Sequence, residues 1–253
     1  MQTILYDGSF EEFLCAVFDV YEYKFQQVNI VQKNKYIKGL FETVHVVQYD
    51  ASHCLRVSTG MKRKLSVQAI RNFHKTFLSE IDGIENVLLQ FVQYVFISSK
   101  NIENDFSHPS VLVVAQTAKK VHREVHRMEA FVRFQKTADD LYYAVIDPDH
   151  NVLSLVAGHF KKRYADQQWL IYDTRRKYGI HYDLENINEV QIAFSQAAGE
   201  GNNIESLYDA DEQMYQQLWQ QYFKSVNIKA RKNLKLQLQH MPKRYWKNMI
   251  ETS

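Results

Sequence analysis

The sequence predicts an α+β fold, a modest and mostly antiparallel sheet flanked by helices, with a helical C-terminal third. Several long segments place apolar side chains at helical spacing, whereas residues 128–182 contain short runs that alternate apolar and polar side chains. Gly and Pro number only 8 and 3 in 253 residues, so long linkers are not expected. We therefore predict a single domain over 1–253, with a possible subdivision into a helix-rich part, 1–105, and an α+β part with basic C-terminal helices, 106–253.

The N-terminal part begins with a short strand, residues 3–6, which ends at Asp7-Gly8. Ser9 then has the position of a helix N-cap, and Glu12 stands three residues later as its capping-box partner. Apolar side chains at helical spacing follow as far as Tyr21. Further along, the pattern predicts two strands and then two helices, at residues 28–31, 44–49, 66–79 and 84–97.

The second part begins with a helix that has Pro109 in its first turn and runs to about His126. The spacing of apolar side chains then changes from a period of 3.6 residues to a period of 2, which predicts a hairpin. The remaining elements are a helix over 152–164, strands at 169–172, 180–182 and 190–194, and helices in the last third, one of which starts near Asn227 and ends before Pro242. The two strands of the hairpin are residues 128–134 and 141–146.

Charge is unevenly distributed, although the net charge is only +2. Residues 178–223 hold eight acids and no Lys or Arg, whereas residues 213–250 hold eight Lys or Arg and no acid. Aromatic rings such as Trp219 and Trp246 are interleaved with the cations. This combination favours nucleic acid, because cations bind phosphates and rings stack on bases. The alternative is an acidic solvated face that pairs with a basic one.

If the basic clusters converge, they form one phosphate-binding face, for which the planar guanidinium of arginine is well suited. The alternatives are that the clusters stay separate, and that Met241, Tyr245 and Trp246 pack into the core. The predicted nucleic-acid-binding residues are Arg127, Arg133, Arg163, Arg175, Arg176, Arg231, Lys243, Arg244 and Trp246.

Four side chains are candidate acid–base groups for a nucleic-acid-processing enzyme of glycosylase, nuclease or phosphodiesterase type: His126, Asp149, His150 and His159. Each has a simpler interpretation. Asp149 could cap the following helix, and His159 could be a hydrogen-bonded core residue. Whether the protein is an enzyme is left open, and its catalytic residues stay unknown.

A metal site is not expected. His122, His126 and Glu129 would share a face only on a continuous helix, and the predicted strand begins near residue 128. The chain also lacks a GxxxxGK[ST] loop, a GxGxxG turn, a GxSxG elbow and iron–sulfur spacing of cysteines. These absences argue against a P-loop ATPase, a Rossmann oxidoreductase, a serine hydrolase and a self-contained radical enzyme. We predict no cofactor.

The two cysteines, Cys15 and Cys54, form no CxxC pair, which favours a reducing cytoplasm. The first residues lack the basic-then-apolar layout of a signal peptide. The most apolar region, residues 84–97, is interrupted by polar side chains and is too short to cross a bilayer. A cytoplasmic protein without a membrane partner is therefore expected.

Six blocks follow one another along the chain: YDGSFEEFLCAVFDVYE, REVHRMEAFVRF, DPDHNVLSLVAGHFKKRY, WLIYDTRRKYGIHYD, LWQQYF and HMPKRYWKN. In this order they resemble an uncharacterised bacterial family, a domain of unknown function whose members are described as DNA metabolism or DNA repair proteins. The resemblance implies DNA as a partner, together with a radical-SAM DNA modification or repair protein that usually accompanies the family. A scaffold that docks this radical-SAM protein without touching DNA is the third hypothesis. No catalytic residue is established for the family.

Overall fold

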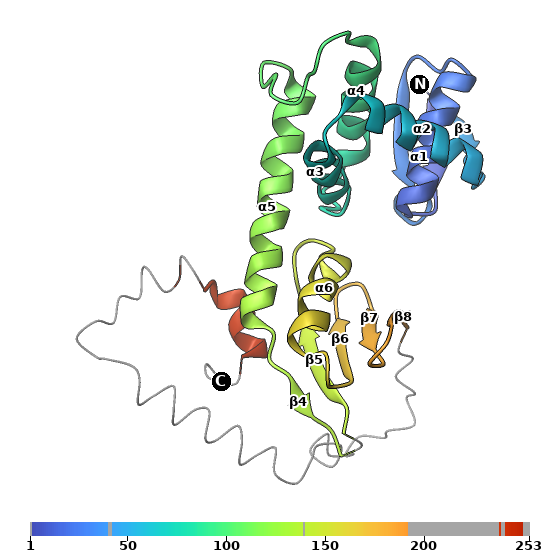
Figure 1. Cartoon of the computed structure of the whole chain (residues 1–253). Coiled ribbons are helices and arrows are strands. Elements are labelled where there is room, and N and C mark those ends of the chain that lie inside the picture. Colours follow the sequence, from blue (N-terminus) through green and yellow to red (C-terminus); the bar gives the residue numbers. More distant parts are fainter. Residues whose placement is uncertain (1, 40–41, 139, 192–237, 239–240, 250–253) are drawn as a thin grey trace. The chain divides into compact units, whose positions relative to one another are not determined.

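Figure 1 shows the computed structural model of the chain, which describes residues 2–39, 42–138, 140–191, 238 and 241–249. The chain divides into two compact units, Met1–His122 and Arg123–Ser253. We call them the N-terminal unit and the C-terminal unit. The division falls inside one helix, α5 (Pro109–Phe131). Among the described residues, no helix has both the length and the apolar character that a bilayer crossing requires.

The N-terminal unit contains a small sheet and several helices. Its sheet has the strand order β2-β1-β3 and is parallel throughout, with Ile4 opposite both Ile30 and His45. Ahead of α5, its elements are β1 (Gln2–Tyr6), α1 (Phe10–Glu22), β2 (Val28–Gln32), the 3-10 helix η1 (Lys33–Lys35), β3 (Thr43–Val46), α2 (Ala51–Lys64), α3 (Val67–Phe77) and α4 (Ile84–Ile97).

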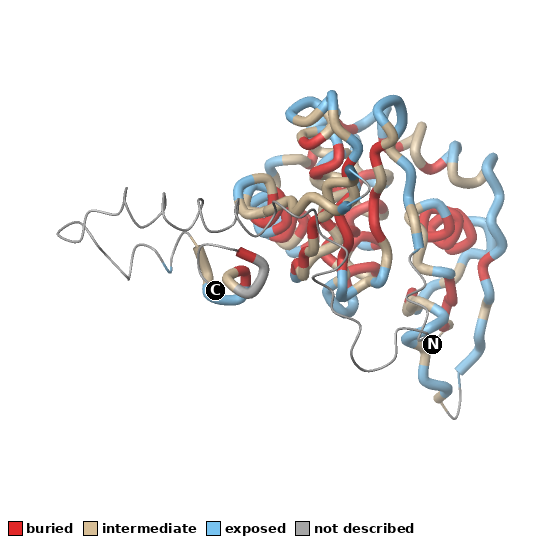
Figure 2. Tube along the Cα trace, turned by 90° about the horizontal axis from the view of Figure 1, so that it is seen from below, coloured by how far each residue is buried: buried red, intermediate tan, exposed pale blue. Residues whose placement is uncertain are grey.

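Apolar rings fill the core of the N-terminal unit. Phe13 is fully buried on α1, and its ring lies 5.4 Å from that of Phe77 and 6.3 Å from that of Phe73, both on α3. Figure 2 shows buried residues in red along the helices and strands. Burial of such large rings contributes most of the stability of a core, about 1.5–3 kcal/mol per side chain.

The start of α1 confirms the predicted helix and its cap. The Ser9 hydroxyl accepts a hydrogen bond from the Glu12 backbone N–H at 3.1 Å. The second half of the capping box differs, because the Glu12 carboxylate accepts from the backbone N–H of Asp7, at 2.6 Å, instead of that of Ser9. The cap still satisfies backbone donors that the first helical turn leaves without partners.

The C-terminal unit is built on a five-stranded sheet with the order β4-β5-β6-β7-β8. Within it, β5 and β6 are parallel, and α6 forms the crossover between them. The neighbouring pairs are antiparallel. Its described elements beyond α5 are β4 (Gln135–Lys136), β5 (Tyr142–Ile146), α6 (Leu153–Arg163), β6 (Trp169–Asp173), β7 (Tyr178–Tyr182), β8 (Ile187–Val190) and the 3-10 helix η4 (Lys243–Asn248).

The core of the C-terminal unit lies where α6 packs against the sheet. Trp169 on β6 is fully buried, and the ring of Phe160 on α6 lies 6.2 Å from it in an edge-to-face arrangement. Phe134, just before β4, contacts both rings, at 5.6 Å from Phe160 and 6.3 Å from Trp169. This packing fixes the β5–α6–β6 unit, and with it the position of the loops at its ends.

The predicted single, mostly antiparallel sheet is wrong. The described residues form two sheets, one parallel with three strands and one mixed with five. The physical reason lies in the connections: β1 and β2 are joined through α1, and β5 and β6 through α6. A helical crossover of this length returns the chain in the same direction, so each such strand pair is parallel.

The predicted strand at residues 128–134 is also wrong, because α5 continues to Phe131. The buried side chains Val121, Val125 and Met128 keep helical spacing, and only Gln135–Lys136 pairs as a strand. Most of the predicted helical C-terminal third lies outside the described residues, as does the Asn227 cap.

Candidate functional site

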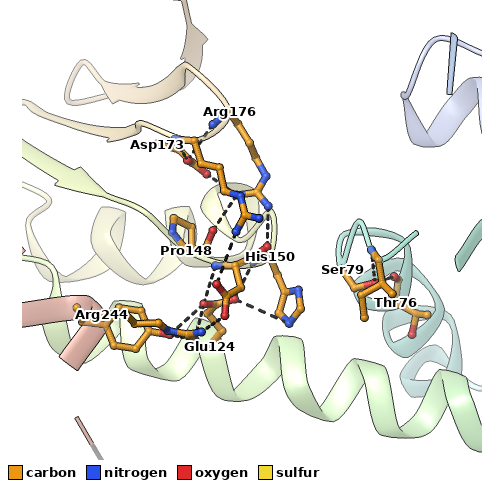
Figure 3. Close-up of polar contacts among 12 residues, drawn as sticks. Thr76, Ser79, Glu124, Pro148, His150, Asp173, Arg176 and Arg244 are labelled. Carbon is orange, nitrogen blue, oxygen red and sulfur yellow. Dashed lines mark hydrogen bonds and ion pairs between the residues drawn. The ribbon is translucent and has the colours of Figure 1, made fainter. Parts of the chain in front are cut away.

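Two polar loops meet at the carboxyl ends of the parallel strands β5 and β6. Residues 147–152 link β5 to α6, and residues 174–177 form the turn between β6 and β7. Because Ile146 pairs with Asp173 in a parallel register, both loops leave the sheet at the same edge. Open α/β sheets bind their ligands at this edge. The charged groups that gather there form what we call the carboxylate–arginine cluster: Glu124, Asp149, Asp173, Arg175, Arg176 and Arg244 (Figure 3).

Glu124 of α5 is the buried centre of this cluster, with a side chain only 2% exposed. Its carboxylate accepts hydrogen bonds from the backbone N–H groups of Asp149, at 2.9 Å, and His150, at 2.8 Å. It also accepts from the Tyr245 hydroxyl, at 2.9 Å, and from Nη2 of Arg244, at 3.1 Å. A buried carboxylate needs such donors to offset the loss of water. Glu124 therefore holds the first loop and η4 against α5.

Asp173 and Arg176 form a second buried pair that joins the two loops. The fully buried Asp173 carboxylate accepts from the backbone N–H groups of Arg175 and Arg176, at 2.9 and 3.1 Å. Nη1 of Arg176 donates to the same carboxylate at 2.9 Å and to the Pro148 carbonyl at 3.2 Å, and Nη2 donates to the Asp149 carbonyl at 3.0 Å. Arg176, 11% exposed, is therefore a positioning residue of the loops.

The outward side of the cluster centres on Asp149, whose side chain is 45% exposed. Arg175, from the second loop, lies 3.6 Å from one Asp149 oxygen, and Arg244, from η4, forms an ion pair with the other. The side chains of these two arginines are 56% and 42% exposed. Two cations from distant segments thus converge on one exposed anion, a geometry that also suits a phosphate oxygen.

The four predicted acid–base candidates divide between two places. Asp149 and His150 belong to the loop at the cluster, and Nε2 of His150 lies 4.0 Å from Glu124. His126 and His159 instead lie 3.7 and 4.0 Å from the carboxylate of Glu129. Glu129 is five residues beyond Glu124 on α5, about 7.5 Å along the helix axis.

Two simpler interpretations at these positions are wrong. Asp149 does not cap α6, whose N-cap is Val152 without a side-chain hydrogen bond, because its carboxylate pairs with the two arginines. His159 is not a core residue, since its side chain is 37% exposed. The predicted strand that would have separated Glu129 from His126 does not form. Both residues lie on the continuous helix α5 and share one of its faces. Even so, the described residues contain no group of three His, Cys, Asp or Glu side chains that could hold a metal ion.

The other predicted nucleic-acid-binding residues lie in several places in the C-terminal unit. Arg133 donates to the carbonyls of Ala130 and Val132 at the end of α5, and Arg127 is half-buried on that helix. Arg163 is exposed at the end of α6, with its guanidinium 5.6 Å from the ring of Tyr164. This end of α6 precedes β6, whereas Arg175 follows it, so about 17 Å of strand separates them. Arg231 lies outside the described residues.

The segment around η4 combines an anchor with an exposed cation. Tyr245 is 3% exposed and packs against Phe131, with ring centroids 5.7 Å apart. Trp246 is half-buried, and its Nε1 donates to the Met241 carbonyl at 3.1 Å. Lys243 is exposed. Core packing therefore accounts for Tyr245, whose ring is not available for stacking on a base.

Glu124 and Asp173 are the members of the carboxylate–arginine cluster that the sequence did not identify by role, whereas packing of Tyr245 into the core was one of the predicted alternatives. A signal for Glu124 was present, because it lies between Val121 and Met128 on the apolar face of α5. An acid on such a face needs buried donors. The donors to Asp173 come from its own turn, and the sequence could not show that Arg176 also reaches the loop after β5.

Replacement of Tyr245 by phenylalanine should make stability less sensitive to alkali. Burial raises the pKa of the Tyr245 hydroxyl above its ordinary value of 10.0, and the charges of Arg244 and Glu124 act in opposite directions on it. A folded-state pKa above the unfolded value makes the free energy of unfolding fall as pH rises past about 10. Tyr245→Phe removes this dependence, besides costing about 1 kcal/mol for the lost hydrogen bond.

Urea unfolding at pH 8 and at pH 10.5 measures the effect, and the exposed Tyr49→Phe is the control. If the free energy of unfolding falls by the same amount from pH 8 to pH 10.5 in wild type and in Tyr245→Phe, ionisation of the Tyr245 hydroxyl is not linked to folding.

Comparison with family models identifies a family for most of the chain. The model of the family described as a domain of unknown function, DUF4130, matches residues 82–251. The matched region includes all six members of the carboxylate–arginine cluster. Searches of the curated proteins and of the solved structures found no significant match. Because the matched segment is well over half of the 253-residue sequence, the chain belongs to the DUF4130 family.

Proposed function

We propose that this protein binds DNA and acts in DNA repair or DNA metabolism, with the exposed side of the carboxylate–arginine cluster as part of the interface. The observation that carries the proposal is the convergence of Arg175 and Arg244 on Asp149. The Asp149 carboxylate takes the place between two guanidinium groups that a backbone phosphate oxygen would take. The exposed Lys243 adds a third cation next to Arg244.

In this proposal the buried and exposed parts of the cluster have different tasks. Glu124, Asp173 and Arg176 hold the loops and η4 in place, and Arg175, Arg244 and Lys243 face the phosphates. Trp246, which is half-buried, lies one turn after Lys243 and supplies an aromatic ring in the same segment. Phosphate contacts position a protein on nucleic acid without reading its sequence. We therefore expect binding with little sequence preference.

The test is a titration of labelled single-stranded and double-stranded oligonucleotides, followed by fluorescence anisotropy at several salt concentrations. Arg175→Ala should weaken binding and reduce the salt slope by about 0.9 for duplex DNA or about 0.7 for a single strand, the loss of one phosphate contact. Asp149→Asn should strengthen binding, because it removes the anion that competes with phosphate.

Lys162→Ala is the matched control, since Lys162 is exposed at the other end of the β5–α6–β6 unit. Folding of each variant is checked by its thermal unfolding. Binding that does not depend on salt, or an Asp149→Asn variant that binds no better than wild type while Arg175→Ala has no effect, would refute the interface.

A second candidate function is a nucleic-acid-processing enzyme. It is favoured by the position of Asp149 and His150 in one loop at the carboxyl edge of the parallel strands, where catalytic groups commonly lie. In that case His150→Gln would abolish a chemical change in a labelled oligonucleotide while leaving its binding intact. Mass spectrometry of oligonucleotides incubated with wild type and with His150→Gln distinguishes this function from binding alone.

The sequence resemblance also supports a partner, and we include it in the proposal: a radical-SAM DNA modification or repair protein. Co-purification of the two proteins tests this step. If they associate while the titration shows no DNA binding, the protein is a scaffold. A cytoplasmic location is part of the same proposal, in line with the unpaired thiols of Cys15 and Cys54.

A further inference from the structure

A groove of about 490 Å³ lies between α3 and α5 in the N-terminal unit. Its volume is in the range of ligand sites, about 300–1,000 Å³. One wall is a stripe of four polar side chains on α3: Gln68, Arg71, Asn72 and Lys75. These positions recur every three or four residues, so they share one helix face.

The opposite wall belongs to α5 and has the same spacing. Ala115 and Ala118 form the floor, and Lys119 and His122 stand above them. Two polar contacts join α3 and α5 beside the groove. The buried Thr76 hydroxyl donates to the Val114 carbonyl at 3.1 Å, and Nζ of Lys75 lies 3.4 Å from Nδ1 of His122.

Among the described residues that line it, the groove has hydrogen-bond donors on both sides and no acid. The two helices explain this, because α3 contains no Asp or Glu and α5 contains none before Glu124. The positive charges of Arg71 and Lys119 are therefore not offset by a carboxylate among the described residues that line the groove. The carboxylate–arginine cluster differs, since carboxylates there offset each guanidinium.

We propose that this groove is a second binding site for the phosphate backbone of a nucleic acid. The proposal rests on the proposed function, because it assumes that the chain binds nucleic acid, but it uses different residues. Side-chain amides, lysines and arginines are typical donors to phosphate oxygens. The alanine floor offers no large apolar anchor of the kind that a protein partner requires. An extended backbone fits a shallow channel with cations on both walls.

The test compares neighbouring lysines of one helix. Lys119 lines the groove, and Lys120 is also exposed but is not one of the lining residues. Lys119→Glu should weaken oligonucleotide binding roughly tenfold at low salt and reduce the salt slope by about one unit. Lys120→Glu should change neither to this extent. Arg71→Glu, from the opposite wall, should act as Lys119→Glu does, and thermal unfolding verifies that all three variants are folded.

The results separate this site from the first one. If Arg175→Ala weakens binding while Lys119→Glu and Lys120→Glu behave alike, the groove is not a nucleic-acid site and the first interface stands. If wild type does not bind oligonucleotides, both proposals fail. Competition by tripolyphosphate and by polyglutamate identifies the ligand. Each competitor is added at the same total charge to the complex of labelled oligonucleotide and protein. The groove proposal is overturned if tripolyphosphate or polyglutamate removes the part of the binding that depends on Lys119 more effectively than an unlabelled oligonucleotide does.

Discussion

Replacement of Asp173 by asparagine should lower the free energy of unfolding by about 3–5 kcal/mol, the cost of removing one partner of a buried ion pair. The side chain is fully buried and accepts from two backbone N–H groups and from Arg176. Asparagine keeps one acceptor oxygen, but it removes the buried negative charge that pairs with Arg176, whose side chain is only 11% exposed. Urea unfolding followed by circular dichroism measures the loss.

Asp183→Asn is the matched control for this variant. Asp183 also follows a strand and also accepts from two backbone N–H groups of its turn, those of Glu185 and Asn186. The Asp183 side chain is more accessible to solvent than that of Asp173, so water can replace the hydrogen bonds that the substitution removes. The free energy of unfolding should therefore fall clearly less for Asp183→Asn than for Asp173→Asn. If both variants lose the same amount, the pairing with Arg176 contributes nothing to stability.

Arg176→Gln in the Asp173→Asn background completes a double-mutant cycle. Because the two side chains are in contact, the cycle should show a coupling energy in the range of about 0.5–3 kcal/mol. Strict additivity of the two losses would show that the ion pair between Asp173 and Arg176 itself contributes nothing to stability.

Replacement of Glu124 by glutamine should cost about 3 kcal/mol. The glutamine amide would direct N–H groups at the donors that now surround the carboxylate, namely those of Asp149, His150, Arg244 and Tyr245. An unpaired buried donor costs about 1–3 kcal/mol. The loss is limited because Arg244, 42% exposed, can turn towards water. The measurement is again the free energy of unfolding, with far-ultraviolet circular dichroism to follow α5.

Glu129→Gln provides the comparison on the same helix. Its carboxylate is 26% exposed and lies 3.7–4.0 Å from two histidines, so its loss should stay within about 1 kcal/mol. A Glu124→Gln variant as stable as Glu129→Gln would mean that the buried carboxylate is not the centre of the site.

The elements that the sequence predicts well are those whose own residues decide them. The α1 helix combines an N-cap with an apolar face, and α6 and the strands β5 and β6 have clear periods. By contrast, α2 was not predicted, because only Val57 and Met61 of its 14 residues are buried and Gly60 weakens the helical pattern. Strand direction depends on partners far along the chain, so local alternation could not show that β1 and β2 are parallel.

The site shows the same limit. A cluster of arginines could be read from the sequence, and the structure brings Arg175, Arg176 and Arg244 together. The sequence could not show which carboxylates these arginines would contact, because Arg244 is 120 residues from Glu124. The basic groove of the N-terminal unit was also missed, because Arg71 and Lys119 are 48 residues apart in the sequence and acquire a shared surface only when α3 packs on α5.

The distance along the chain between the parts of the cluster has a consequence for synthesis on the ribosome. Glu124 and both loops emerge before η4, and at 5–20 residues per second the 68 residues from Arg176 to Arg244 take roughly 3–14 s to translate. During that interval the nascent chain lacks both Arg244 and Tyr245. Its C-terminal unit therefore reaches full stability only after translation has passed η4.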